Sequence, residues 1–133
     1  MSTTYEIANF IPQRPPFVFI DRIEAVNAER AVTRYTIPEE VPFVTNGRLT
    51  LAGLMENAAQ TCAVRAGFWG QNKIGYIGAV KRMQVHRLPA VGETLTTEVT
   101  LIQEVLNISL VECLTRIGQE TIATASLKLA ILD

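Results

Sequence analysis

Hydrophobic and polar residues alternate along most of the chain, and one segment in the middle departs from this alternation. Alternating runs bounded by turn residues are typical of half-buried β-strands. A short helix is expected before them, from Thr4 to Phe10, because Pro12 and the pair Pro15-Pro16 would end it. The strands are expected at residues 17–26, 29–37, 74–87, 93–105, 107–117 and 121–132.

The segment from Thr50 to Trp69 contains no proline and few β-branched residues but many Ala and Leu residues, which predicts a helix of about five turns. It is apolar on nearly every side, so we expect it to be buried nearly all round. A long apolar helix among antiparallel strands predicts an α+β fold in which the sheet wraps around one central helix. The length fits a single domain over residues 1–133. The open edge of the sheet needs a cover, so we expect a dimer with residues 74–87 as the interface strand.

Composition excludes several classes of function. Hydrophobic residues make up 48% of the chain, charged residues 19%, and the net charge is −1, so the basic excess of a nucleic-acid-binding protein is missing. No apolar run approaches the roughly 20 residues of a membrane span, and the N-terminus lacks the pattern of a signal peptide. We therefore expect a cytoplasmic protein. Cys62 and Cys113 lie in apolar surroundings, which predicts buried free thiols.

Glu56 is the residue of the predicted helix with the clearest chemical interest. Gln60 follows it by one turn, whereas Arg65 falls about 180° away around the helix and cannot pair with it. A carboxylate on an apolar helix is costly unless it is paired, hydrogen-bonded or functional. One interpretation is an acid–base group that faces a cavity at a subunit interface. The other is a carboxylate that is hydrogen-bonded to Gln60 and only shapes that interface.

The single histidine, His86, lies near a strand end between Gln84 and Arg87, which is more typical of a surface or interface residue than of a catalytic base. No Ser/His/Asp arrangement is possible without it, and no metal-ligand spacing occurs. Lys81, Arg82 and Arg87 share one predicted strand. They form either a solvated face or a basic rim for a phosphopantetheine arm or an acidic carrier protein.

Three segments carry a resemblance to a known family. Residues 11–22 read Ile-Pro-Gln-Arg-Pro-Pro-Phe-Val-Phe-Ile-Asp-Arg, residues 56–60 read Glu-Asn-Ala-Ala-Gln, and the strand from Gly78 ends in a turn at Gly92-Glu93. Together they resemble the FabZ/FabA-type beta-hydroxyacyl-acyl-carrier-protein dehydratases. The family has a Pro-His-Arg-x-Pro-Phe opening, a Glu-Ala-Met-Ala-Gln helix segment and a Pro-Gly-Asp/Glu turn at these places.

The resemblance implies a hotdog fold and a dimer whose two sheets join edge to edge, with two active sites at the interface. In this family an acidic residue on one helix works with a loop histidine of the other subunit. Glu56 matches the acid and Gln60 the helix glutamine, and the backbone N–H groups around Leu51 and Ala52 match the place that binds the thioester carbonyl. No cofactor is implied, since phosphopantetheine of an acyl carrier protein or coenzyme A carries the substrate.

The loop histidine of the family is missing. Its Gly-His-Phe-Pro sequence is replaced by Val44-Thr45-Asn46-Gly47-Arg48. This pattern is similar to the histidine-lacking dehydratase-like proteins of aryl-polyene and flexirubin-type pigment pathways. Glu56 and Asn46 are therefore the expected catalytic residues, with Asn46 limited to orienting the substrate because an amide cannot take up a proton. Gly47 is expected beside it as a substrate contact, together with Gln60, Leu51 and Ala52.

Three functions remain open at this point. The first is a divergent 3-hydroxyacyl-acyl-carrier-protein dehydratase of fatty-acid or polyene biosynthesis, as a homodimer or in a heterodimer with a histidine-containing dehydratase. The second is a non-catalytic subunit that binds acyl chains within such a heterodimer. The third is an acyl thioesterase that uses Glu56 as base or nucleophile. All three use the same helix and interface, so the sequence does not separate them.

Overall fold

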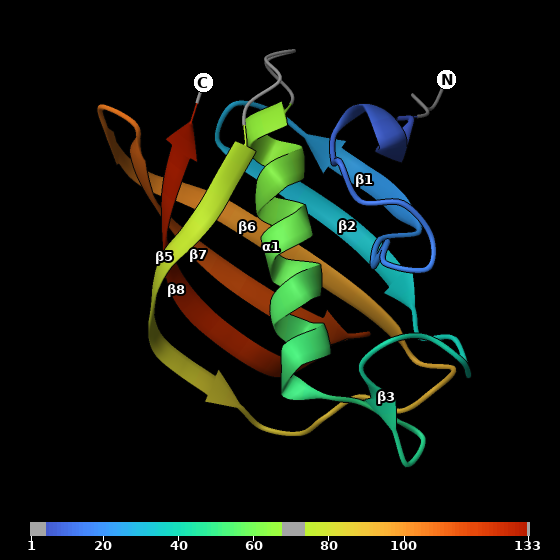
Figure 1. Ribbon diagram of the computed structural model, residues 1–133. Helices are drawn as coiled ribbons and strands as arrows, with labels where there is room; N and C mark the ends of the chain where they lie inside the picture. Colours follow the sequence, from blue (N-terminus) through green and yellow to red (C-terminus); the bar gives the residue numbers. More distant parts are fainter. Residues whose placement is uncertain (1–4, 68–73, 133) are drawn as a thin grey trace.

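An antiparallel sheet curves around a single long helix (Figure 1). The computed structural model describes residues 5–67 and 74–132. The six strands of the sheet run in the order β1-β2-β6-β7-β8-β5, and every neighbouring pair is antiparallel. The α+β arrangement predicted from the sequence is thereby confirmed. The strands are β1 (Arg22–Val26), β2 (Arg30–Thr36), β5 (Ile74–Val85), β6 (Thr94–Val105), β7 (Ile108–Ile117) and β8 (Glu120–Leu132).

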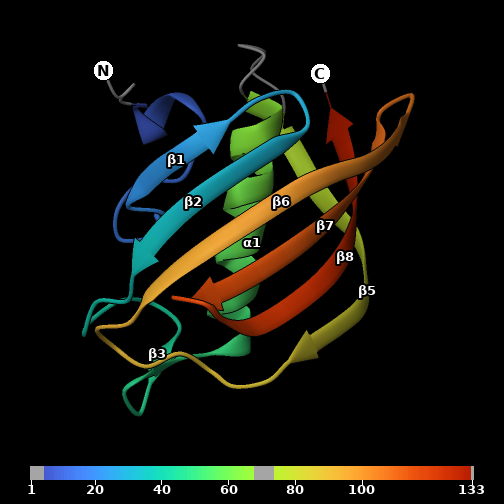
Figure 2. The same ribbon diagram turned by 180° about the vertical axis from the view of Figure 1, so that it is seen from behind.

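Strand β5 forms one edge of the sheet and pairs only with β8 among the described strands, as Figure 2 shows from behind. It is irregular at two places, where the pairing with β8 shifts between Ile77 and Ala79 and again between Lys81 and Gln84. Gly78 lies at the first shift, and Arg82, with a left-handed φ of 51°, lies at the second. The unpaired edge agrees with the strand expected at residues 74–87, and its role as an interface stays a prediction.

The helix α1 (Leu51–Gly67) begins after Thr50, whose hydroxyl Oγ1 accepts a 3.4 Å hydrogen bond from the N–H of Gly53. The first turn packs tightly on the strand before it, because a Cβ at Gly53 would lie only 2.3 Å from Cδ1 of the buried Leu49. The predicted helix extended to Trp69, which lies outside the described residues. No helix in the described part of the chain has the length and hydropathy needed to span a membrane.

The prediction that α1 is buried nearly all round is wrong. One face remains open between β5 and the N-terminal segment (Figure 1). Leu51 and Ala52 are exposed on the first turn, and Met55, Glu56, Ala59, Ala63 and Ala66 are partly exposed along the helix. Four other polar residues of the helix point into the protein and are at most 2% exposed: Asn57, Gln60, Thr61 and Arg65.

The inward polar residues bind backbone that belongs to no strand. Sequence alternation predicted that the first strand starts at Phe17, but β1 begins only at Arg22. The backbone N–H of Phe19 donates to Oε1 of Gln60 at 2.8 Å, and the carbonyl of Phe19 accepts from Nδ2 of Asn57 at 2.7 Å. Gln60 Nε2 also donates to the carbonyl of Phe17 at 2.8 Å. The helix side chains thus supply the hydrogen bonds that a neighbouring strand would give, which explains why the predicted strand is too long.

Residues 43–49 form a small hairpin, in a region where the sequence analysis predicted neither a strand nor a helix. Its strands are β3 (Val44–Thr45) and β4 (Arg48–Leu49). Asn46 and Gly47 have φ angles of 54° and 74°, so both are left-handed, as a two-residue type I′ turn requires. Near the N-terminus, the expected short helix is a single 3₁₀ turn, η1 (Ile7–Asn9), and Thr4 lies outside the described residues.

Candidate functional site

Glu56 lies on the open face of α1, and Gln60 holds its carboxylate. Gln60 Nε2 donates to Oε1 of Glu56 at 3.0 Å, while Oε1 of Gln60 accepts the N–H of Phe19. The Phe19 bond fixes which end of the amide faces Glu56. The second carboxylate oxygen, Oε2, has no hydrogen-bond donor among the described residues. Gln60 was expected to contact substrate. Its amide nitrogen already donates to Glu56 and its amide oxygen already accepts from Phe19, so the structure favours a positioning role.

Arg65 donates to the carbonyl of Ala28 at 2.7 Å and does not pair with Glu56, as predicted.

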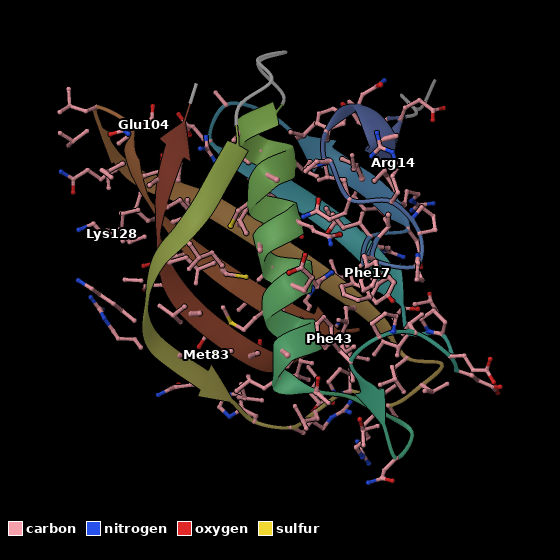
Figure 3. The ribbon with its side chains drawn as sticks, viewed as in Figure 1. Arg14, Phe17, Phe43, Met83, Glu104 and Lys128 are labelled. Carbon is pink, nitrogen blue, oxygen red and sulfur yellow. The ribbon has the colours of Figure 1, made fainter. Side chains whose placement is uncertain are left out.

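Exposed aromatic side chains flank this part of the helix. Phe17 is 52% exposed and Phe43 is 42% exposed, and both lie beside α1 on the side away from β5 (Figure 3). The ring of Phe43 also packs on Phe19, with a centroid distance of 5.8 Å. The sequence gave no sign that these two residues would be exposed. These rings give the side of the helix away from β5 an exposed apolar surface.

Leu51 and Ala52 occupy the exposed start of α1, as the resemblance required. The first N–H groups of a helix have no acceptor within the helix and carry partial positive charge. They are therefore suited to bind a carbonyl oxygen that gains negative charge during a reaction. That the thioester carbonyl binds here stays a prediction.

Asn46 and Gly47 form the exposed turn of the β3–β4 hairpin, beyond the first turn of the helix (Figure 1). The carbonyl of Gly47 accepts the N–H of Val91 at 2.9 Å, which attaches the hairpin to the loop before β6. No hydrogen bond joins Asn46 to Glu56. The two expected catalytic residues therefore make no direct bond within one chain, and their joint role stays a prediction. The Asn-Gly pair is itself a strong type I′ hairpin signal, so the sequence could have predicted the turn.

A narrow apolar crevice separates α1 from the sheet on the β5 side of the helix. Leu54, Met55 and Ala58 line it from the helix, Met83 lines it from β5, and Leu127 lies on its sheet wall. Its free volume is about 10 Å³, which is room for one water molecule at most. Methionine side chains adapt readily to a new neighbour. The crevice is too narrow for an acyl chain as it stands, and the sequence analysis did not identify Met55 or Met83.

The other groups with possible nucleophilic or acid–base chemistry are less suited to it. Cys62 and Cys113 are buried free thiols, as predicted. Burial raises the pKa of both, that of Cys113 to about 12. Burial and the neighbouring Asp21 raise the pKa of Tyr35 to about 12. These groups therefore remain protonated at neutral pH. His86 is exposed just after β5.

Arg87 is not part of a free basic rim. Its guanidinium binds the carboxylate of Glu93 through two hydrogen bonds of 2.8 and 2.9 Å, and Nε donates to Glu120 at 2.9 Å. Arg87 therefore joins the loop before β6 to the start of β8. Lys81 and Arg82 are the members of the proposed rim that remain exposed on β5.

The Arg87–Glu93 pair predicts an acid-sensitive contribution to stability. The hydrogen bond from Arg87, and then the N–H of Ala90, lower the pKa of Glu93 from 4.5 to about 2. A carboxyl group whose pKa is lower in the folded state stabilises the fold above its unfolded value and loses this effect as the pH falls. Wild-type protein should thus exceed Glu93→Gln in stability at neutral pH, and the difference should shrink between pH 4.5 and 2. Urea unfolding of both proteins at several pH values in this range measures the difference in the free energy of unfolding. Glu39→Gln, at an exposed position, is the control. A difference between wild type and Glu93→Gln that does not change with pH would contradict the stabilising role of the Arg87–Glu93 pair.

Comparison with known proteins gives the family. Residues 5–131 match the ApeP-like family, described as ApeP dehydratase. The 3-hydroxyacyl-[acyl-carrier-protein] dehydratase FabZ of Syntrophomonas wolfei is 34% identical over 110 residues, covering 75% of this chain and 76% of the relative. FabZ of Levilactobacillus brevis is 26% identical over 133 residues, covering 94% of this chain and 90% of the relative.

Solved structures share the fold at low sequence identity. The dehydratase heterocomplex ApeI:P from Xenorhabdus doucetiae superposes with a TM-score of 0.88 at 14% identity, covering 100% of this chain and 93% of that chain. The E. coli PaaI protein superposes with a TM-score of 0.70 at 16% identity, covering 81% of this chain and 80% of that chain. The sheet wrapped around one helix is the hotdog fold, as the resemblance implied. The match over nearly the whole chain, together with the FabZ relatives, shows that the protein belongs to the ApeP-like dehydratase family.

Proposed function

We propose that this chain is one subunit of a dimeric 3-hydroxyacyl-[acyl-carrier-protein] dehydratase, in which it supplies Glu56 and the partner supplies the second proton-transfer group. The observation that carries the proposal is the hydrogen bonding and exposure of the Glu56 carboxylate. One carboxylate oxygen is held by Gln60, and the other has no donor among the described residues and lies on the open face of the helix. A FabZ-type partner would bring the loop histidine that this chain lacks.

Dehydration breaks the C2–H and C3–O bonds of a 3-hydroxyacyl thioester and forms a C2=C3 double bond and water. A base must take the C2 proton, and an acid must donate a proton to the leaving hydroxyl group. Glu56 supplies one of these transfers, and the partner's histidine supplies the other. The N–H groups of Leu51 and Ala52 stabilise the negative charge that develops on the thioester oxygen when C2 loses its proton.

The open surfaces of the chain support a mixed dimer. The unpaired edge of β5 lies next to the open face of α1 (Figure 1), so a partner that pairs with β5 would also cover Glu56. The structure of similar fold from X. doucetiae is a dehydratase heterocomplex of two different chains. We also place the protein in the cytoplasm, since Cys62 and Cys113 are free thiols of the kind that reducing compartments maintain.

A rescue experiment tests the proposal. A histidine-containing FabZ-type dehydratase is inactivated at its own helix carboxylate and co-purified with this chain. We expect 3-hydroxyacyl turnover to return in the mixed dimer, because Glu56 and the partner's histidine complete one site. Glu56→Gln in this chain should remove the rescue. No rescue in a demonstrated mixed dimer, with no turnover by this chain alone, would leave the non-catalytic acyl-binding subunit as the better account. Release of thiol from a saturated acyl thioester in the same assay would support the thioesterase alternative.

A further inference from the structure

We propose that Asn46, in the exposed turn of the β3–β4 hairpin, is a site of spontaneous deamidation in the folded chain, and that its isoaspartate product loosens the hairpin from the loop before β6. Asparagine is one of the chemically labile side chains of proteins. The reaction consumes only water and is independent of the proposed function. It replaces a neutral amide with a carboxylate that is charged at neutral pH.

The reaction joins two neighbouring groups of the turn. The backbone nitrogen of Gly47, after losing its proton to a base in the solvent, attacks the side-chain carbon Cγ of Asn46. The bond between this nitrogen and Cγ forms, the bond from Cγ to Nδ2 breaks, and Nδ2 takes up a proton and leaves as ammonia. Water then opens the resulting succinimide ring at one of its two carbonyl groups. Opening at Cγ gives aspartate, and opening at the main-chain carbonyl gives isoaspartate.

Both reacting groups are free in the folded chain. Asn46 and Gly47 are exposed. Within residues 5–67 and 74–132, the N–H of Gly47 donates no hydrogen bond, and the side-chain amide of Asn46 takes part in none. The carbonyl oxygen of Gly47 is the engaged group of the turn, since it accepts from Val91. The attacking nitrogen therefore has no hydrogen bond to break before it reacts.

The turn is uncrowded around Gly47. A glycine has no side chain beside its nitrogen, so the approach to Cγ of the preceding asparagine is unobstructed. Even a Cβ built on Gly47 would meet no heavy atom within 4 Å. The Asn46 side chain projects from an exposed position and can rotate toward this nitrogen. Sequence and surroundings thus both favour closure of the ring.

The turn between β1 and β2 contains a matched asparagine that lacks these features. Asn27 is also exposed, but its Oδ1 accepts the N–H of Glu29 at 2.8 Å and that of Arg30 at 2.9 Å. These two bonds form an Asx-turn that holds the side chain in place. The next residue, Ala28, also carries a Cβ beside the nitrogen that would attack. Asn27 is therefore an internal control within the same molecule.

Isoaspartate changes the backbone of the hairpin as well as its charge. The main chain then runs through the former side chain of Asn46, which adds one carbon atom to a two-residue turn that fits a type I′ geometry. The hairpin is attached to the loop before β6 by the N–H of Val91, which donates to Gly47 at 2.9 Å, and by the N–H of Leu49, which donates to Pro89 at 2.9 Å. The Gly47–Val91 bond adjoins the lengthened turn, so we expect it to weaken first.

Mass spectrometry of the folded protein tests the reaction. During incubation well below the melting temperature, the peptide with Asn46 should exchange an amide for a carboxylate, while the peptide with Asn27 should not change. Isoaspartyl methyltransferase should label the incubated protein and should lose most of this labelling in Asn46→Gln. The rate should rise by up to about 10-fold per pH unit, because the attacking nitrogen must first lose a proton. Asn46→Asp supplies the reference for the aspartate product.

Three outcomes would overturn the proposal. Product that forms in urea but not in the folded chain would show that the native turn protects Asn46. Equal conversion of Asn27 and Asn46 would show that free groups and an open turn do not select the site. Hydrogen exchange examines the consequence, since the N–H of Val91 should exchange faster in the isoaspartate form than in fresh protein. Unchanged exchange at Val91 after isoaspartate has formed would refute the loosening of the hairpin.

Discussion

Glu56→Gln is expected to lower dehydration by the mixed dimer about 10²–10⁴-fold, the loss that usually follows removal of one general acid–base group. Glutamine has nearly the same size, and its carbonyl oxygen can still accept the hydrogen bond from Gln60 Nε2. The substitution therefore removes proton transfer and leaves the local packing in place. Steady-state kinetics on a carrier-bound 3-hydroxyacyl substrate measures the loss.

Two comparisons make this prediction specific. Glu112→Gln removes a carboxylate on the exposed outer face of β7 and should leave turnover unchanged. The melting temperature of Glu56→Gln should stay close to that of the wild type, which separates lost chemistry from lost folding. Undiminished turnover by Glu56→Gln would show that the carboxylate only shapes the interface, the second interpretation that the sequence allowed.

Asn57→Ala is expected to lower the free energy of unfolding by about 3 kcal/mol, because it leaves two buried groups without partners that each cost about 1–3 kcal/mol. The Asn57 side chain is fully buried, donates to the carbonyl of Phe19 at 2.7 Å and accepts from the hydroxyl of Thr97 at 2.6 Å. A domain of this kind is stable by about 5–15 kcal/mol, so the loss is a large part of the total. Urea unfolding followed by circular dichroism measures it.

Thr97→Val provides the matched control for Asn57. It removes the hydroxyl group that donates to Asn57 but keeps the size of the side chain, so we expect a smaller loss of about 1 kcal/mol. The double variant should lose less than the sum of the two single losses, because both remove the same hydrogen bond. If Asn57→Ala changed stability by less than about 0.5 kcal/mol, the effect usual for surface positions, the buried network would not hold the N-terminal segment as described.

The strands of the second half could be predicted closely from the sequence. Residues expected at 93–105, 107–117 and 121–132 form strands at 94–105, 108–117 and 120–132. In these strands one face packs on the core and the other faces outward, so alternation reports the structure directly. The same alternation misplaced the start of the first strand, because the backbone around Phe17 and Phe19 is bound by side chains of a distant helix. A pattern read along the chain carries no information about such partners.

The burial of α1 was the main error. The helix was predicted to be buried nearly all round, but one of its faces is open, and the polar residues Asn57 and Gln60 point inward because the segment they bind has no strand beside it. The Glu56–Gln60 contact could be predicted, since residues four apart on a helix are neighbours whatever surrounds them. The position of Asn46 could not, because it depends on how the hairpin packs on the loop near Val91.

The inward polar residues of α1 separate the requirements of folding from those of catalysis. Asn57, Thr61 and Gln60 hold the helix, the N-terminal segment and the sheet together, whereas Glu56 joins this network only by accepting one bond from Gln60. A duplicated gene could therefore lose its acid–base group through a single codon change and still encode a chain that folds and assembles. A hotdog lineage built in this way can produce inactive paralogues at little cost, and the active copy beside them can then evolve to depend on their presence.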